Sequence, residues 1–191
     1  LHSFIALDDG IYVLEDPGGT LAYYSFDFAS RIQITAKQYR DTYIIADSNT
    51  RIRLISEKQT FFILQDGELF ELDPTRNEFT FVDKGIRALL FSPNAKIVAL
   101  QKDHEVFVYW MKETTRTPKH EEGDIELIMR LSSPIRGISW LSTPYQYLAI
   151  ETENALHIAE LDGDGGRNIV TYTHLASPHA FSWNEEEKNL F

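Results

Sequence analysis

A repeated β unit is the feature that most constrains how this chain folds. Its clearest copy spans residues 86–133, where turns rich in Pro, Asn and Asp separate four apolar runs. These runs are Ile86–Phe91, Ile97–Leu100, Val106–Trp110 and Ile125–Leu131. Short runs rich in β-branched and aromatic residues between such turns are typical of strands joined by hairpins. The unit therefore predicts a four-stranded antiparallel meander, which is the blade of a β-propeller.

Much of the remaining chain repeats this unit. The stretch IRALLFSPNAKIVAL, from Ile86, matches IRGISWLSTPYQYLAI, from Ile135, and a third copy starts incompletely at His179. An aromatic residue ends the inner strand of each copy: Phe91, Trp140 and Trp183. These aromatic residues lie 49 and 43 residues apart, and propeller blades recur at about 40–50 residues.

Hairpins inside the units match as well. Asp8-Asp9-Gly10 and Asp66-Gly67 mark two of them, because Gly accepts the positive φ that a tight turn requires. Four hairpin arms align: Ile11–Val13, Leu69–Phe70, Val106–Val108 and Leu156–Ile158. The predicted fold class is all-β, with residues 1–191 forming a single β-propeller domain or a propeller fragment of four-stranded antiparallel blades. We expect about four blades, and a fifth cut off at Phe191, as part of a larger ring. The alternative is that the strands at the two ends of the chain complete one blade between them.

Charge and composition exclude several kinds of partner and site. The formal net charge is −11, and an acidic surface repels phosphate backbones, so we expect no nucleic-acid partner. Cysteine is absent, which excludes disulfides and Cys-based zinc sites. No apolar run approaches the roughly 18 residues that cross a bilayer, so we expect no transmembrane segment in this piece. Because the chain starts at Leu1 rather than Met, we expect an excised piece whose missing N-terminal part could hold a membrane anchor.

Two stretches resemble a known repeat family. FSPNAKIVAL, from Phe91, resembles the W-S-P-D-G-x-x-I-A-F element of TolB-like (WD40-like) propeller repeats. LHIAELDGDGGRNIV, from Leu156, resembles their I-Y-V-x-D-x-D-G-x-x-x-R-x-L element, with Asp162, Gly163 and Arg167 on the pattern. The order of strands, and the long polar loop after Trp110, is also similar to propellers attached to PEGA domains in bacterial envelope proteins. The resemblance covers roughly residues 61–191 and implies an extracytoplasmic binding scaffold, although a fold alone does not define a ligand.

No residue set predicts catalysis, a metal or a cofactor. Asp162, Asp164 and Asn168 lie in a Gly-rich loop whose oxygen atoms could hold Ca²⁺. The loop lacks the EF-hand spacing, so a strand connection built from turn-forming Asp and Gly is the simpler interpretation. The chain also lacks a G-x-S-x-G motif. We therefore predict no catalytic residue, no metal site and no cofactor, and the chain is not expected to be an enzyme.

His157 is predicted to be structural. It aligns with Tyr12, Phe70 and Phe107 in the other hairpins, where blades place a ring in the packing between them. A buried, packed histidine is therefore a better interpretation than a ligand or a catalytic base.

Tyr109 and Trp110 are the predicted binding residues. Neighbouring strand residues point to opposite faces, so we expect one of them to pack between blades and the other to meet solvent or a partner. Exposed Trp is enriched in binding hot spots. The alternative is that the polar loop 112–124 folds over this side chain. Loops on a rigid scaffold often carry binding residues, so we also expect this loop to be the most mobile segment and to border the partner surface.

The favoured function is a non-catalytic binding or scaffold module of a bacterial cell-envelope protein, which binds a protein or a cell-envelope polymer. This function requires a leader or a membrane anchor before Leu1. Two alternatives stay open. One is the regulatory or substrate-gating propeller of a larger peptidase-type enzyme, with a hydrolase domain after Phe191. The other is a cytoplasmic scaffold of the WD-repeat kind.

Overall fold

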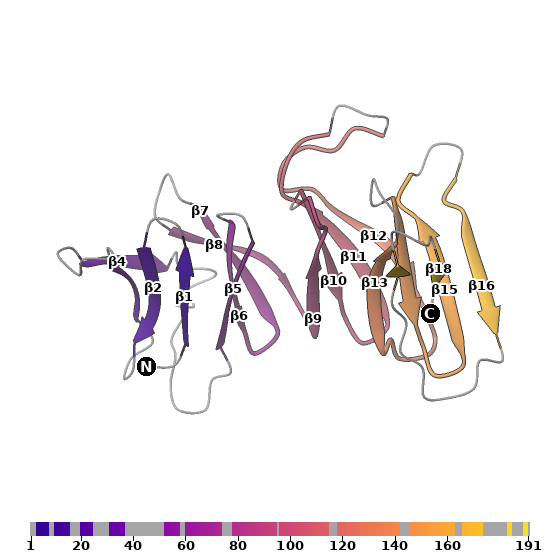
Figure 1. The fold of residues 1–191 in the computed structure, drawn as a ribbon, viewed down its shortest axis with the longest axis horizontal. Coiled ribbons are helices and arrows are strands. Elements are labelled where there is room, and N and C mark those ends of the chain that lie inside the picture. The colour runs from indigo at the N-terminus through magenta and orange to yellow at the C-terminus, as the bar shows by residue number, and fades with distance from the viewer. Residues whose placement is uncertain are drawn as a thin grey trace. The chain divides into compact units, whose positions relative to one another are not determined.

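The computed structural model is built from strands (Figure 1). It describes residues 3–7, 10–15, 20–24, 31–36, 52–57, 60–73, 78–94, 96–114, 118–141, 146–162, 166–173, 183–184 and 189–190. Every element within these residues is a strand, which confirms the all-β fold class. In the same residues there is no helix with the length and apolar character to cross a membrane. The chain divides into two compact units, residues 1–86 and 87–191.

The first unit holds two antiparallel meanders. Their strands are β1 (Ser3–Leu7), β2 (Gly10–Glu15), β3 (Thr20–Tyr24), β4 (Arg31–Ala36), β5 (Ile52–Glu57), β6 (Thr60–Gln65), β7 (Glu68–Asp73) and β8 (Glu78–Lys84). A short parallel pairing of β4 with β8, at Thr35–Glu78 and Ala36–Phe79, joins them into one sheet. The sequence does not predict this pairing. It arises because β4 and β8 are both outer strands, and each offers a free edge to the other.

The second unit contains the two clearest predicted copies as separate four-stranded sheets. Their strands are β9 (Ala88–Phe91), β10 (Ile97–Gln101), β11 (Glu105–Trp110), β12 (Ile125–Arg130), β13 (Gly137–Leu141), β14 (Tyr147–Glu151), β15 (Ala155–Glu160) and β16 (Ile169–Thr173). A two-stranded sheet follows, formed by β17 (Trp183–Asn184) and β18 (Asn189–Leu190). The four-stranded antiparallel sheets are confirmed and fit the blades of a propeller. Whether they close a ring, and whether both units share it, stays a prediction.

One hairpin of each meander has the same register: β1–β2, β6–β7, β10–β11 and β14–β15. The paired residues are Ile5 and Tyr12, Ile63 and Phe70, Leu100 and Phe107, and Ile150 and His157. In every pair the second residue follows the first by seven positions. This confirms the predicted alignment of His157 with three aromatic residues. At the β6–β7 turn, Asp66 and Gly67 both have positive φ, of 50° and 84°, as the hairpin signal requires.

The core of the second unit lies between its two sheets. Apolar residues of β10, β11 and β12 form one cluster with residues of β13, β14 and β15, including Val108, Trp110, Trp140, Leu148 and Ile150. The Trp140 indole Nε1 donates a hydrogen bond to the carbonyl oxygen of Leu90, 3.1 Å away in the other sheet. Trp140 therefore packs between the two four-stranded sheets.

The β10–β11 turn accepts hydrogen bonds from the segment that leads into β13. The backbone N–H of Leu131 donates to the carbonyl of His104, and that of Ile135 donates to the carbonyl of Asp103, both at 2.8 Å. The buried Gln101 side chain donates to the carbonyl of Ile135 at 3.0 Å. These hydrogen bonds hold the segment before β13 to the β9–β12 sheet.

Candidate functional site

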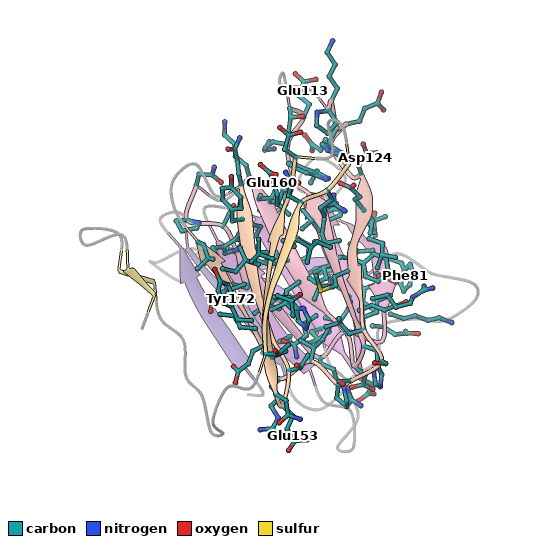
Figure 2. All side chains as sticks on the ribbon, turned by 90° about the vertical axis from the view of Figure 1, so that its right-hand side faces the viewer. Phe81, Glu113, Asp124, Glu153, Glu160 and Tyr172 are labelled. Carbon is teal, nitrogen blue, oxygen red and sulfur yellow. The ribbon has the colours of Figure 1, made fainter. Side chains whose placement is uncertain are left out.

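The connection between β11 and β12, residues 111–124, is here called the arm. Figure 1 shows its described residues, 111–114 and 118–124, extending beyond the ends of β11 and β12, and Figure 2 labels Glu113 and Asp124 among them. At the root of the arm, the backbone N–H of Trp110 donates to the backbone carbonyl of Asp124 at 2.9 Å. The backbone N–H of Gly123 donates to the backbone carbonyl of Trp110 at 2.8 Å. The backbone of the arm therefore continues the pairing of β11 with the chain that becomes β12.

Local side-chain chemistry shapes the arm above its root. The Thr114 N–H donates to the carbonyl of His120, and the His120 N–H donates to the Thr114 hydroxyl, both at 2.9 Å. The Glu121 N–H donates to the Asp124 carboxylate at 2.8 Å. Gly123 has a φ of 95°, a conformation that favours glycine. These bonds position His120 on the inner side of the arm. Whether the arm is the most mobile segment stays a prediction.

Tyr109 and Trp110 are both buried, with 6% and 8% of their surfaces exposed. The expectation that one of them meets solvent is therefore wrong. The His120 ring stacks on the Trp110 indole, with ring centroids 4.0 Å apart and planes 8° from parallel. The structure agrees with the alternative, in which the polar loop 112–124 folds over this side chain, because the loop residue His120 covers Trp110. A binding role for Tyr109 or Trp110 stays a prediction, but neither side chain offers a partner an exposed ring.

Arg167 joins the two sheets beside this stack. Its Nε donates to the carbonyl of Glu160 at 2.8 Å, and its Nη1 donates to the carbonyl of Leu127 at 3.1 Å. Its Nη2 donates to the Glu126 carboxylate at 2.6 Å. The Arg167 side chain is only 14% exposed. A planar guanidinium can serve three acceptors in fixed directions, so this one side chain holds β12 to the end of β15.

Four side chains lie together at the root of the arm and are here called the latch: Trp110, His120, Glu126 and Arg167. The His120 Nε2 lies 3.8 Å from the second carboxylate oxygen of Glu126, which is too long for a hydrogen bond. Both of these atoms, and the Trp110 Nε1, are buried without a hydrogen-bond partner among the described residues. The latch therefore combines tight packing with buried polar atoms whose hydrogen bonding is incomplete.

Sequence reasoning missed His120 and Glu126 and found Arg167 only through the resemblance. One signal was present for Glu126. It lies opposite Val108, so a carboxylate occupies an inward position of an outer strand. A charge at such a position requires a buried partner, and Arg167 is that partner, 41 residues further along the chain.

The other residues considered in the sequence have ordinary partners. His157 is half-buried, whereas the sequence predicts a buried position. Its Nδ1 lies 2.9 Å from the Thr171 hydroxyl on the neighbouring strand, and partial burial lowers the pKa of His157 below its usual value. Asn168 donates its side-chain amide to Glu160 at 2.6 Å. Asp164, which belongs to the loop considered for Ca²⁺, lies outside the described residues. Within those residues no three His, Cys, Asp or Glu side chains gather closely enough to hold a metal ion.

Comparisons with known proteins bear on the fold. No protein-family profile matches the chain, and no curated protein is similar to it in sequence. Solved structures that resemble it include propeller-like, WD40-type folds. The likeness indicates a propeller-type fold. Kluyveromyces lactis Hsv2 superposes with a TM-score of 0.51 at 9% identity, over 90% of this chain and 51% of that protein.

Two bacterial structures are also similar. The extracellular domain of a candidate hybrid two-component system from B. thetaiotaomicron gives a TM-score of 0.52 at 16% identity, over 97% of this chain and 25% of that one. A 6-phosphogluconolactonase candidate from Bacteroides uniformis gives 0.48 at 14% identity, over 98% of this chain and 61% of that one. The last score is too low to carry an argument. This chain spans less than two thirds of each of these proteins, and at such identities the likeness is one of fold alone.

Proposed function

We propose that this chain is a non-catalytic β-propeller module that binds a partner protein, and that the arm is its recognition element. The finer form of the proposal follows the resemblance to TolB-like repeats and to the propellers of PEGA-domain proteins. It assigns the parent protein to the bacterial cell envelope, outside the cytoplasm. A cell-envelope polymer is the other class of ligand that this assignment allows.

The observation that carries the proposal is an exposed arm on a fixed root. Lys112, Glu113, Glu121 and Glu122 are all exposed, whereas His120 packs on Trp110 beneath them. A root that is already ordered lowers the entropy that binding must offset. Charged side chains on such a support select a partner by complementary charge more than by apolar contact. A net charge of −11 favours a partner with a basic surface.

The test changes the exposed side chains of the arm and leaves its root intact. The variant replaces Lys112, Glu113, Glu121 and Glu122 by Ala together, and affinity is measured by interferometry against the partner isolated with the parent protein. We expect a loss of at least about tenfold, because the variant removes four of the arm's seven charged side chains. A change below about twofold contradicts the proposal. Trp110→Ala is not a suitable probe, because this residue is part of the core and its loss would unfold the root.

A matched control lies at the opposite end of β11. Arg87 and Asp103 form an exposed ion pair through two contacts of 2.7 and 3.0 Å beside the β10–β11 turn. Arg87→Ala with Asp103→Ala should leave affinity unchanged, because the arm leaves β11 at its other end. An equal loss in both variants would mean that the binding surface is not confined to the arm, and this would contradict the proposal.

The location is tested separately, by fractionating cells that express the parent protein at its natural level. The envelope assignment predicts that the protein is recovered with periplasmic or membrane fractions. Recovery with the soluble cytoplasmic fraction would refute that assignment without deciding whether the arm binds a partner.

A further inference from the structure

The outer strand of the last complete sheet, β16, is exposed along its whole length. It pairs with β15 only, so its second edge makes no strand pairing within the described residues. Ile169, Val170 and Tyr172 are 47%, 52% and 51% exposed, and they are among the most exposed large apolar residues that the structure describes. Figure 2 views the molecule from the side on which β16 lies and labels Tyr172. A free edge with apolar side chains is a template for another strand.

This edge lacks the protection that the corresponding strands have. Proteins commonly block strand edges with charged side chains. The last strands of the other three meanders contain charges: Arg31 in β4, three charged residues in β8, and Glu126 and Arg130 in β12. In contrast, β16 reads Ile-Val-Thr-Tyr-Thr, without a charge and without proline. Edge pairing is therefore less opposed at β16 than at the last strands of the other meanders.

We propose that β16 pairs antiparallel with β16 of a second copy of this chain, around a two-fold axis at Thr171. This register places Val170 opposite Tyr172 of the partner copy, and Ile169 opposite its Thr173. A β-branched residue opposite an aromatic one is a favourable cross-strand pair. The same register brings no like charges together within the strand. Val170 and Tyr172 lie opposite Ile158 and Leu156 of β15, so their face continues an apolar surface of the sheet.

The size and charge of the interface indicate a weak dimer. A single five-residue strand from each copy buries less area than the roughly 1,200 Å² of a small specific interface. Each copy also carries a net charge of −11, so the two copies repel one another. Salt screens this repulsion over about 10 Å at 0.1 M. The dimer should therefore become tighter as salt concentration rises, whereas an association driven by opposite charges would become weaker.

The first experiment is sedimentation equilibrium of the full chain in 50 and 500 mM NaCl. We expect a reversible dimer with a dissociation constant of roughly 10–100 μM, as befits a small interface, and several-fold tighter binding at the higher salt. Val170→Lys should abolish the dimer, because it places two like charges beside the axis. Ile125→Lys, at an exposed position of β12, is the matched control and should dimerise normally. A chain that stays monomeric up to about 500 μM overturns the proposal.

The second experiment uses the absence of cysteine from the chain. Directly opposed residues of an antiparallel pair have Cα atoms about 4.5–5.5 Å apart, within the range that a disulfide spans. Thr171→Cys should therefore form a covalent dimer on mild oxidation. In the proposed register the two copies of residue 173 lie about 14 Å apart along the strand direction, so Thr173→Cys should not. Equal cross-linking of the two variants would overturn the register, and no cross-linking of either would overturn the interface.

Discussion

Replacing Arg167 tests whether one side chain holds the two sheets of the second unit together. Arg167→Ala removes three hydrogen bonds, to Glu160, Leu127 and Glu126. It also leaves the Glu126 carboxylate, which is about one third exposed, without its cation. A hydrogen bond to a charged group is worth roughly 1.5–3 kcal/mol, and breaking a buried pair costs roughly 3–5 kcal/mol. Because Glu126 keeps some solvent contact, we expect a loss of about 2–4 kcal/mol.

Tryptophan fluorescence during urea unfolding is a suitable assay for this loss. All three tryptophans lie between residues 87 and 191, so the signal reports the second unit. Arg136→Ala is the matched control. Arg136 donates to Glu153 at 2.9 Å, but the two side chains are 45% and 64% exposed, and exposed pairs contribute roughly 0–1 kcal/mol. If both Arg variants lose the same free energy of unfolding, the reasoning about Arg167 is refuted.

A double-mutant cycle separates the ion pair from the two backbone contacts. Glu126→Gln keeps the shape of the side chain and removes its charge. If the pair matters, the effects of Arg167→Ala and Glu126→Gln should fall short of additivity by about 1 kcal/mol or more, as is found for residues in contact. Arg167→Lys should recover only part of the stability, because an ammonium cannot serve three acceptors in fixed directions.

Two further predictions concern single residues of the second unit. Trp140→Ala should cost about 3–5 kcal/mol in urea unfolding, because the buried indole fills space between the sheets; a loss below about 0.5 kcal/mol would place Trp140 outside the core. His157 has a lowered pKa in the fold, so the unfolded chain takes up its proton first as the pH falls through the usual value of about 6.5. The stability that neutral His157 contributes is therefore complete above about pH 6.5 and is lost towards lower pH. His157→Phe, which introduces the aromatic residue type of the aligned positions, should reduce the difference in the free energy of unfolding between pH 7 and pH 5. An unchanged pH dependence in His157→Phe would show that other groups set it.

Elements specified by local pattern could be predicted from the sequence. Turn residues and alternating side chains are encoded within a few positions, so they predicted the sheets of the second unit and the alignment of His157 with Phe107. They also predicted that Trp140 lies near the end of β13, because an aromatic residue recurs at the end of each inner strand. In each case the physical cause lies within one repeat, and the repeat is visible in the sequence.

Features that join distant segments could not be predicted in the same way. Glu126 and Arg167 belong to different sheets, and no periodicity links their positions. The pairing of β4 with β8 depends on two free edges meeting, which strand patterns do not encode. Trp110 packs in the core between the sheets, and His120 also stacks on its ring because hydrogen bonds between Thr114 and His120 shape the arm. A polar loop without an apolar run can therefore cover a tryptophan with a single ring.

The hydrogen bonds from residues 131 and 135 to the β10–β11 turn have a consequence for how the chain folds during its synthesis. Residues 86–133 leave the ribosome before any of the next sheet, and domains generally fold as they emerge. A completed β9–β12 sheet then offers both an apolar face and a fixed starting point for the residues that follow. The ends of the connecting segment are already close together, so the second sheet forms without a long loop having to close. Growth from one repeat to the next also limits the time that apolar strands of a nascent chain remain available to neighbouring chains.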